Sequence, residues 1–132
     1  MADLEITSID LATLGVSREK HHRYLAGDAA TQGFLLYEGD ACLAYVYVNA
    51  GGHIGPLAVT RSDRVGAAFA SALHRAIARG ASQVSAFLPG VSEEAFGSAI
   101  ASGLRITFPM VLLSSHAFGD WTRYLPRNPG FM

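Results

Sequence analysis

The sequence predicts a mixed domain of the α+β or α/β class, in which an antiparallel hairpin precedes a strand–helix–strand unit. Two apolar runs flank a Gly-Asp pair at residues 39–40, which is a hairpin signal. HIGPLAV (residues 53–59) then precedes a segment whose apolar residues recur at helical spacing, and QVSAFLP (residues 83–89) returns to a strand pattern. Antiparallel strands followed by a β-α-β unit indicate a mixed sheet.

The front of the chain predicts one strand and one short helix. LEITSI (residues 4–9) alternates apolar and polar side chains, which favours a strand. SREKHHRYLA (residues 17–26) favours a helix that Ser17 caps and Gly27 ends.

The hairpin is formed by FLLYE (residues 34–38) and CLAYVYV (residues 42–48). Side chains alternate across a strand, so the second run is expected to present two different faces. One face would carry Cys42, Ala44, Val46 and Val48, and the other Leu43, Tyr45 and Tyr47. Because both faces are largely apolar, this strand is expected to be central.

The main helix is predicted over residues 63–79. Its apolar side chains form one stripe at i, i+4, i+7, i+8 and i+11, namely Val65, Phe69, Ala72, Leu73 and Ala76. Ser62 or Thr60 is expected to cap its N-terminus, where Asp63 also suits the positive end of the helix dipole. Gly80 ends it.

The next segments predict a strand, a helix and another strand. QVSAFLP reads as a buried strand, expected to run parallel to residues 53–59. Ser92 is expected to cap a second helix, which ends at Gly103 and buries the stripe Phe96, Ala99, Ile100 and Gly103. LRITFPMVLLSS (residues 104–115) favours a long apolar strand, interrupted by Pro109.

The last residues, 118–132, have no periodicity and form a C-terminal tail. Its large side chains are expected to pin the tail to the domain or to a partner: Trp121, Tyr124, Leu125 and Phe131. The whole chain, residues 1–132, is interpreted as a single domain.

Composition narrows the classes of function. Half of the residues are hydrophobic and 16% are charged, below the ~25% typical of soluble domains, so we expect a homo-oligomer, most simply a homodimer. The formal net charge of −1 gives no electrostatic case for nucleic acid or an anionic membrane. One cysteine excludes a disulfide framework, and no metal site is expected. Without a signal peptide or a membrane-length apolar run, a cytoplasmic location is expected.

The turn between residues 60 and 68 invites two interpretations. A helix N-terminus can hold a phosphate, and Arg61, Arg64 and Gly66 would support that role. In the alternative, Ser62 caps the helix, Asp63 satisfies its dipole, and Gly66 serves helix–sheet packing.

Gly55 and Pro56 interrupt the preceding strand, because proline has no backbone N–H to donate to a ladder. We expect a break or bulge here, which would splay residues 53–55 from the strand that follows the helix.

This order of elements resembles the GNAT (Gcn5-related N-acetyltransferase) superfamily over roughly residues 33–115. Leu57-Ala58-Val59 matches the end of the family's central strand. Gly66 and Ala68 fit its glycine-rich turn, and Ala95 and Gly103 fit the spacing of its second helix. The resemblance implies a mostly antiparallel sheet with a β-α-β crossover and helices on both faces.

The resemblance also implies acetyl-CoA as cofactor. The pantetheine arm would pair with the strand at Leu57, Ala58 and Val59. The turn would hold the pyrophosphate through the group Arg61, Arg64, Val65, Gly66, Ala67 and Ala68.

For the chemistry, His53 falls where many family members carry a glutamate base, and a histidine titrates near neutral pH. Ala99 stands where the family has its tyrosine acid, which leaves Tyr124 as a candidate acid.

Two functions follow from the resemblance. The first is an acetyl-CoA-dependent N-acetyltransferase acting on an amine of a small molecule or peptide. The second is a catalytically degenerate GNAT-like module for dimerisation or ligand binding, similar to one half of a tandem GNAT protein. Three features favour the second. Asp63 places a carboxylate in the turn that would hold the pyrophosphate, Ala99 replaces the tyrosine acid, and the front of the chain is short.

Overall fold

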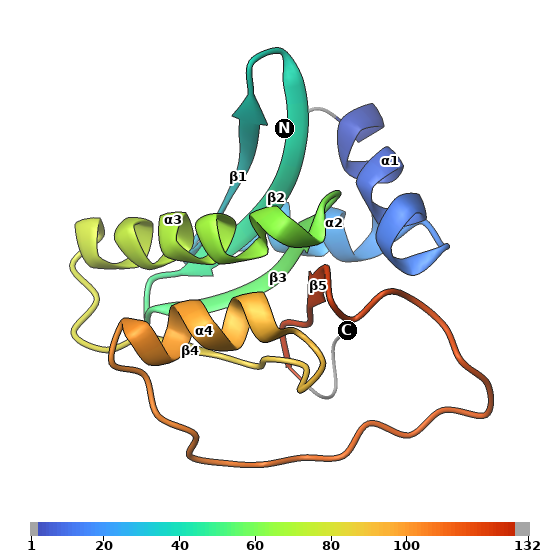
Figure 1. The fold of residues 1–132 in the computed structure, drawn as a ribbon. Coiled ribbons are helices and arrows are strands. Elements are labelled where there is room, and N and C mark those ends of the chain that lie inside the picture. The colour runs from blue at the N-terminus through green and yellow to red at the C-terminus, as the bar shows by residue number, and fades with distance from the viewer. Residues whose placement is uncertain (1–2, 129–132) are drawn as a thin grey trace.

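A computed structural model of the chain describes residues 3–128 (Figure 1). These residues fold into a mixed α+β architecture, as the sequence predicts. In chain order the elements are α1 (Asp3–Leu14), α2 (Glu19–Ala26), β1 (Thr31–Glu38), β2 (Ala41–Asn49), β3 (His53–Val59), the 3-10 helix η1 (Ser62–Arg64), α3 (Val65–Ala78), β4 (Ser85–Ala86), α4 (Glu93–Ala101) and β5 (Tyr124–Leu125).

The strands form one mixed sheet in the order β1-β2-β3-β4, with β5 also paired to β3. β1, β2 and β3 are antiparallel neighbours, whereas β4 runs parallel to β3 after the crossover through α3. The predicted hairpin, the parallel pair and the central position of β2 are therefore confirmed.

The β1–β2 ladder carries one extra residue on β2. Leu36 pairs with Ala44 and Tyr37 pairs with Cys42, so Leu43 is bulged. As a result Leu43 packs with the core on the α3 side, and Cys42 packs on the opposite side. The predicted faces of these two residues are wrong, while the alternation along the rest of the strand is as predicted.

Helices cover both faces of the sheet (Figure 1). α3 and α4 lie on one face, and the core there includes the whole predicted stripe of α3: Val65, Phe69, Ala72, Leu73 and Ala76. α1 and α2 lie on the other face, against Tyr45 and Tyr47 of β2.

Residues 4–9 belong to helix α1, so the predicted strand is wrong. The buried side chains of α1 occupy positions 6, 9, 10, 13 and 14, which is the i, i+3, i+4, i+7, i+8 spacing of a helix. The six-residue window shows an alternation but is too short to reveal this longer period.

The helices end as predicted but do not begin as predicted. Gly27, Gly80 and Gly103 follow α2, α3 and α4, yet none of these helices has a side-chain hydrogen bond from its N-cap residue. Ser92 instead donates to the Thr122 carbonyl (3.4 Å). In α4 the residues facing the core are Ala95 and Ala99, and the predicted stripe member Ile100 is exposed.

Two predicted strands are shortened or absent. β4 covers two residues of the predicted seven. Residues 104–115 form no strand and run outside the body of the domain (Figure 1). A strand requires a neighbour to pair its backbone groups, and this segment has none among the described residues.

The tail packs onto the domain, as predicted. Tyr124 and Leu125 are buried in β5, beside the half-buried Trp121. Phe131 lies outside the described residues.

None of the helices among residues 3–128 combines the length and the apolarity needed to span a membrane.

Candidate functional site

The predicted cofactor site lies where β3 and β4 separate. These strands pair only at His53–Ser85 and Ile54–Ala86. On its other side β3 pairs with β2, where Ile54 lies opposite Val48 and Leu57 lies opposite Val46. The three-residue step on β3 spans a two-residue step on β2, so Gly55 and Pro56 lie in the predicted bulge. The predicted splay of residues 53–55 is wrong for His53 and Ile54, which stay paired with β4, and the pairing of the two strands ends at the bulge.

The chain's own tail occupies this divergence. We call residues 120–128 the strap. β5 lies antiparallel to β3, with Leu125 opposite Leu57 and Tyr124 opposite Ala58. The Val59 N–H donates to the Arg123 carbonyl (2.9 Å). The backbone edge that the resemblance assigns to pantetheine is therefore already paired, and Leu57, Ala58 and Val59 are fully buried.

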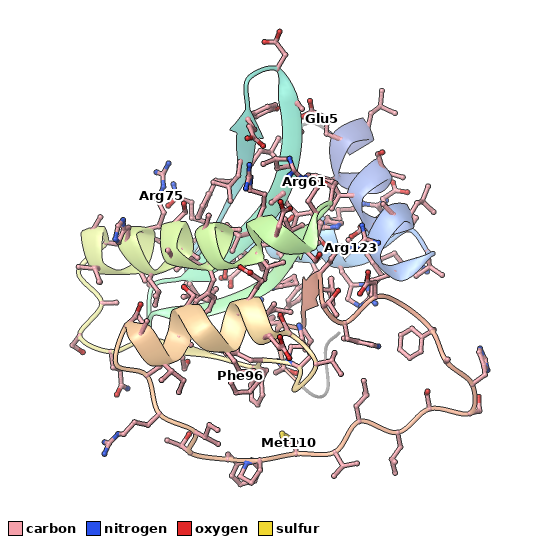
Figure 2. All side chains as sticks on the ribbon, viewed as in Figure 1. Glu5, Arg61, Arg75, Phe96, Met110 and Arg123 are labelled. Carbon is pink, nitrogen blue, oxygen red and sulfur yellow. The ribbon has the colours of Figure 1, made fainter. Side chains whose placement is uncertain are left out.

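The side chain of Arg123, labelled in Figure 2, makes three hydrogen bonds, two of which fasten the strap to other elements. Its guanidinium donates to the Asp120 carboxylate (2.7 Å), the Thr60 carbonyl (2.7 Å) and the Ala12 carbonyl (2.8 Å). Because Thr60 follows β3 and Ala12 belongs to α1, this arginine ties the strap to two separate elements.

Gly55 permits the strap to approach closely. Its φ is +136°, a conformation that side-chain-bearing residues rarely adopt. A Cβ here would lie 2.7 Å from the Pro126 carbonyl oxygen. The glycine of the bulge thus accommodates the tail.

His53, the candidate base, is held on both ring nitrogens. Nε2 lies in a short contact with the Arg127 carbonyl oxygen, which can only accept a hydrogen bond, so Nε2 carries the proton. Nδ1 lies 2.9 Å from the Ser85 hydroxyl and, in the neutral ring, accepts from it. Neither nitrogen is available to take a proton from an amine in this arrangement.

The arginines of the turn are paired with carboxylates. Arg61 donates to both oxygens of Asp63 (3.1 and 2.7 Å), and Arg64 donates to Glu38 (3.1 Å). The hydrogen bond from Arg61 lowers the pKa of Asp63, and the hydrogen bond from Arg64 lowers the pKa of Glu38. Two cations face two anions, so the turn offers no excess positive charge to a pyrophosphate.

Gly66 faces α4, and its Cβ would lie 2.9 Å from the carboxylate of Glu94. Ser98 of α4 donates to the Gly66 carbonyl (3.2 Å). Gly66 therefore lies at the contact between α3 and α4, and not at the helix–sheet contact that the sequence predicts.

Four of the predicted cofactor-binding residues lie around one small hollow, whereas Val65 is buried in the core. Val59, Arg64, Ala67 and Ala68 contribute to a space of about 80 Å³ between α3 and the hairpin. Another hollow, of about 270 Å³, lies between α1 and β2. Both are smaller than the ~300–1,000 Å³ of typical ligand pockets.

Tyr124, the candidate acid, belongs to a closed polar cluster between α1, α2 and the sheet. Burial raises its pKa to about 12. We name this group the tyrosine–histidine cluster; its members are Asp10, His22, Tyr45, Tyr47 and Tyr124. His22 contacts Tyr45 edge-to-face, and Trp121 contacts Tyr124 in the same way.

Asp10 is the hub of this cluster. It is fully buried and accepts from the Tyr45 hydroxyl (2.5 Å) and from His22 Nε2 (2.7 Å). His22 Nδ1 in turn lies 2.7 Å from the Tyr47 hydroxyl. Burial raises the pKa of Tyr45 well above its ordinary value. Since the tyrosines and Asp10 are shielded from solvent, the cluster fixes α1 and α2 to the sheet instead of meeting a substrate.

Sequence reasoning missed this cluster because its members are spread from residue 10 to residue 124. One signal was available: Tyr45 and Tyr47 share a strand face, and buried tyrosine hydroxyls require partners.

Within residues 3–128 no group of three or more His, Cys, Asp or Glu side chains is placed to hold a metal ion. A scan against protein-family models, a search of curated proteins and a search of solved structures each find no match to this chain.

Proposed function

We propose that this chain is a GNAT-like domain that serves as a binding and assembly module and does not transfer acetyl groups. One observation carries the proposal: the strap occupies the edge of β3 where β3 and β4 diverge. A pantetheine arm would need the same backbone groups, and the Val59 N–H already has a partner.

The electrostatics of the turn support the same proposal. A pyrophosphate would have to displace Glu38 and Asp63 from the two arginines. The candidate base His53 is bonded on both sides, and the candidate acid Tyr124 is buried.

An acetyl-CoA-dependent N-acetyltransferase, acting on an amine of a small molecule or peptide, is the second candidate. The divergence of the two parallel strands at the Gly55–Pro56 bulge favours it. In that case the strap must leave the edge of β3 before the cofactor binds.

Thermal unfolding with acetyl-CoA separates the two candidates. A ligand at about 100 times its Kd adds about 2.7 kcal/mol of stability. We expect no change in Tm for the full chain at millimolar acetyl-CoA. A dose-dependent rise in Tm would overturn the module and support the transferase.

Arg123→Ala tests whether the strap is the obstacle. It removes three side-chain hydrogen bonds of the strap, whereas Arg105→Ala removes an exposed arginine elsewhere and is the matched control. If the strap blocks a competent site, Arg123→Ala alone should gain acetyl-CoA-dependent stability. If acetyl-CoA raises the Tm of neither variant, the result supports the proposal of a non-catalytic module.

A further inference from the structure

Residues 105–118, which we call the arm, are the part of the described chain that buries least. Six large apolar side chains on it are half to mostly exposed: Ile106, Phe108, Met110, Val111, Leu112 and Leu113. Exposed fractions of 82% for Val111 and 85% for Leu113 mean that the fold of the single chain does not use these side chains. A soluble monomer rarely exposes such a continuous apolar stretch.

The arm is anchored at both ends. Before it, Leu104 packs against the core, and its N–H donates to the Ala99 carbonyl (3.0 Å). After it, the Asp120 N–H donates to the Thr13 carbonyl (2.6 Å). Figure 1 shows the segment crossing from α4 to β5 at a distance from the body, and Met110 lies midway along it in Figure 2. The arm thus connects two anchored points and presents its apolar side chains between them.

The backbone of the arm also lacks partners. Between residues 105 and 118 the described structure contains no backbone–backbone hydrogen bond. Apart from Pro109, which has no N–H to donate and must lie at an unpaired position, residues 104–115 have the composition of a strand, and a strand is stable only where another strand pairs with it. An extended partner strand would cover the apolar side chains of the arm and would pair its backbone groups.

We propose that the partner is the arm of a second copy of this chain, paired antiparallel about a two-fold axis. A two-fold interface brings the same surface of each copy together, so that surface must complement itself. Residues 106–113 carry no charge, and self-pairing therefore meets no electrostatic repulsion.

The available area suits a dimer. An aromatic side chain such as Phe108 covers about 150–250 Å² and an aliphatic one less, so the six residues, half to mostly exposed, present on the order of several hundred Å². One partner of a standard interface contributes about 800 Å². An amphipathic membrane contact would be expected to add a basic face, whereas the arm has Arg105 as its single lysine or arginine.

This inference rests on the proposed function, because it names the partner of the assembly module. Sedimentation of the full chain over a concentration series is the test, and we expect a closed dimer. Val111→Asp and Leu113→Asp should each weaken the dimer at least tenfold, because each places like charges in the paired arms. Leu4→Asp is the matched control, since Leu4 is 87% exposed on α1 and away from the arm.

Circular dichroism of each variant checks that the fold is retained, and Leu113→Ser replaces any aspartate variant that fails to fold. A wild-type chain that stays monomeric at about 1 mM, the level of a weak interface, would overturn the inference. So would a dimer indifferent to both arm variants, an open-ended oligomer, or a monomer that binds phosphatidylcholine vesicles through the arm.

The acetyl-CoA titration on the same samples keeps the two proposals distinct. A monomer that ignores acetyl-CoA contradicts the arm interface alone. A dimer that binds acetyl-CoA contradicts the blocked cofactor site, on which the non-catalytic proposal rests, and leaves the arm interface in place.

Discussion

The two faces of the sheet are held by different forces. On the α3 and α4 face, Val46, Phe69 and Leu73 belong to a large apolar core, and the buried polar side chain recorded beside it is Ser92, which precedes α4. On the α1 and α2 face, tyrosine hydroxyls, His22 and the Asp10 carboxylate lie among the apolar groups. The first face depends mainly on the packing of apolar volume, whereas the second depends on packing and on a network of buried hydrogen bonds.

This difference predicts opposite sensitivities. Truncation should damage the apolar face equally at every pH. The polar face should respond to the loss of single atoms and to the ionisation of its tyrosines.

Phe69→Ala should have the largest effect. The ring is fully buried against the sheet, and its loss removes apolar burial and leaves a cavity, at a cost of about 3–5 kcal/mol. Denaturant unfolding at pH 8 and pH 10 should give the same loss. Ile77→Ala, on the exposed side of the same helix, is the control and should change stability little. A loss that varies with pH would remove the distinction between the faces.

Alkaline pH should next destabilise the polar face. The pKa of Tyr124 is raised to about 12 in the fold, above its ordinary value of 10. The neutral form is therefore favoured by folding, so its contribution is complete below pH 10 and is lost between pH 10 and 12. Two pKa units correspond to about 3 kcal/mol. Unfolding free energies measured from pH 8 to 12 should fall accordingly, and Tyr124→Phe should flatten the part of this fall due to Tyr124.

Tyr45→Phe should cost about 2 kcal/mol, because it removes one hydroxyl that donates to a buried carboxylate. Tyr37→Phe is matched in chemistry, since Tyr37 donates to Glu5 (2.7 Å) at an exposed site. We expect no measurable change there, because water replaces the lost partner. Equal losses in both variants would mean that burial does not strengthen the Tyr45–Asp10 bond.

Glu19→Ala should have the smallest effect. Glu19 and Arg23 form an i, i+4 pair on α2 with both side chains more than 70% exposed. Such pairs contribute about 0.3–0.5 kcal/mol. Salt should abolish even this difference, and a larger loss would show that the outer surface of α2 matters to the polar face.

Short-range patterns sufficed for the hairpin, α3 and the bulge at Gly55 and Pro56. In each of these the responsible residues lie within one element or two adjacent ones. The same method failed at residues 4–9, where the six-residue window covers fewer than two helical turns, and at residues 104–115. An apolar run predicts a strand, but pairing needs a neighbour that the sequence does not specify.

The candidate site divides in the same way. Sequence patterns identified the turn and the strand divergence, and four of the named residues, Val59, Arg64, Ala67 and Ala68, do line one hollow. The patterns did not reveal that the carboxylate of Glu38, 26 residues before Arg64, would pair with the Arg64 guanidinium and neutralise its charge.

The sequence alone therefore determined the mixed sheet, its hairpin and the buried stripe of α3, because those features depend on periodicity and local turn chemistry. Three features were decided by the tertiary structure alone: the strap occupies the edge of β3, Asp10 joins two helices to the sheet, and the arm lies exposed. Each of these depends on contacts between residues distant in the chain. Such contacts form when a long loop closes, and they produce no periodic pattern in the local sequence.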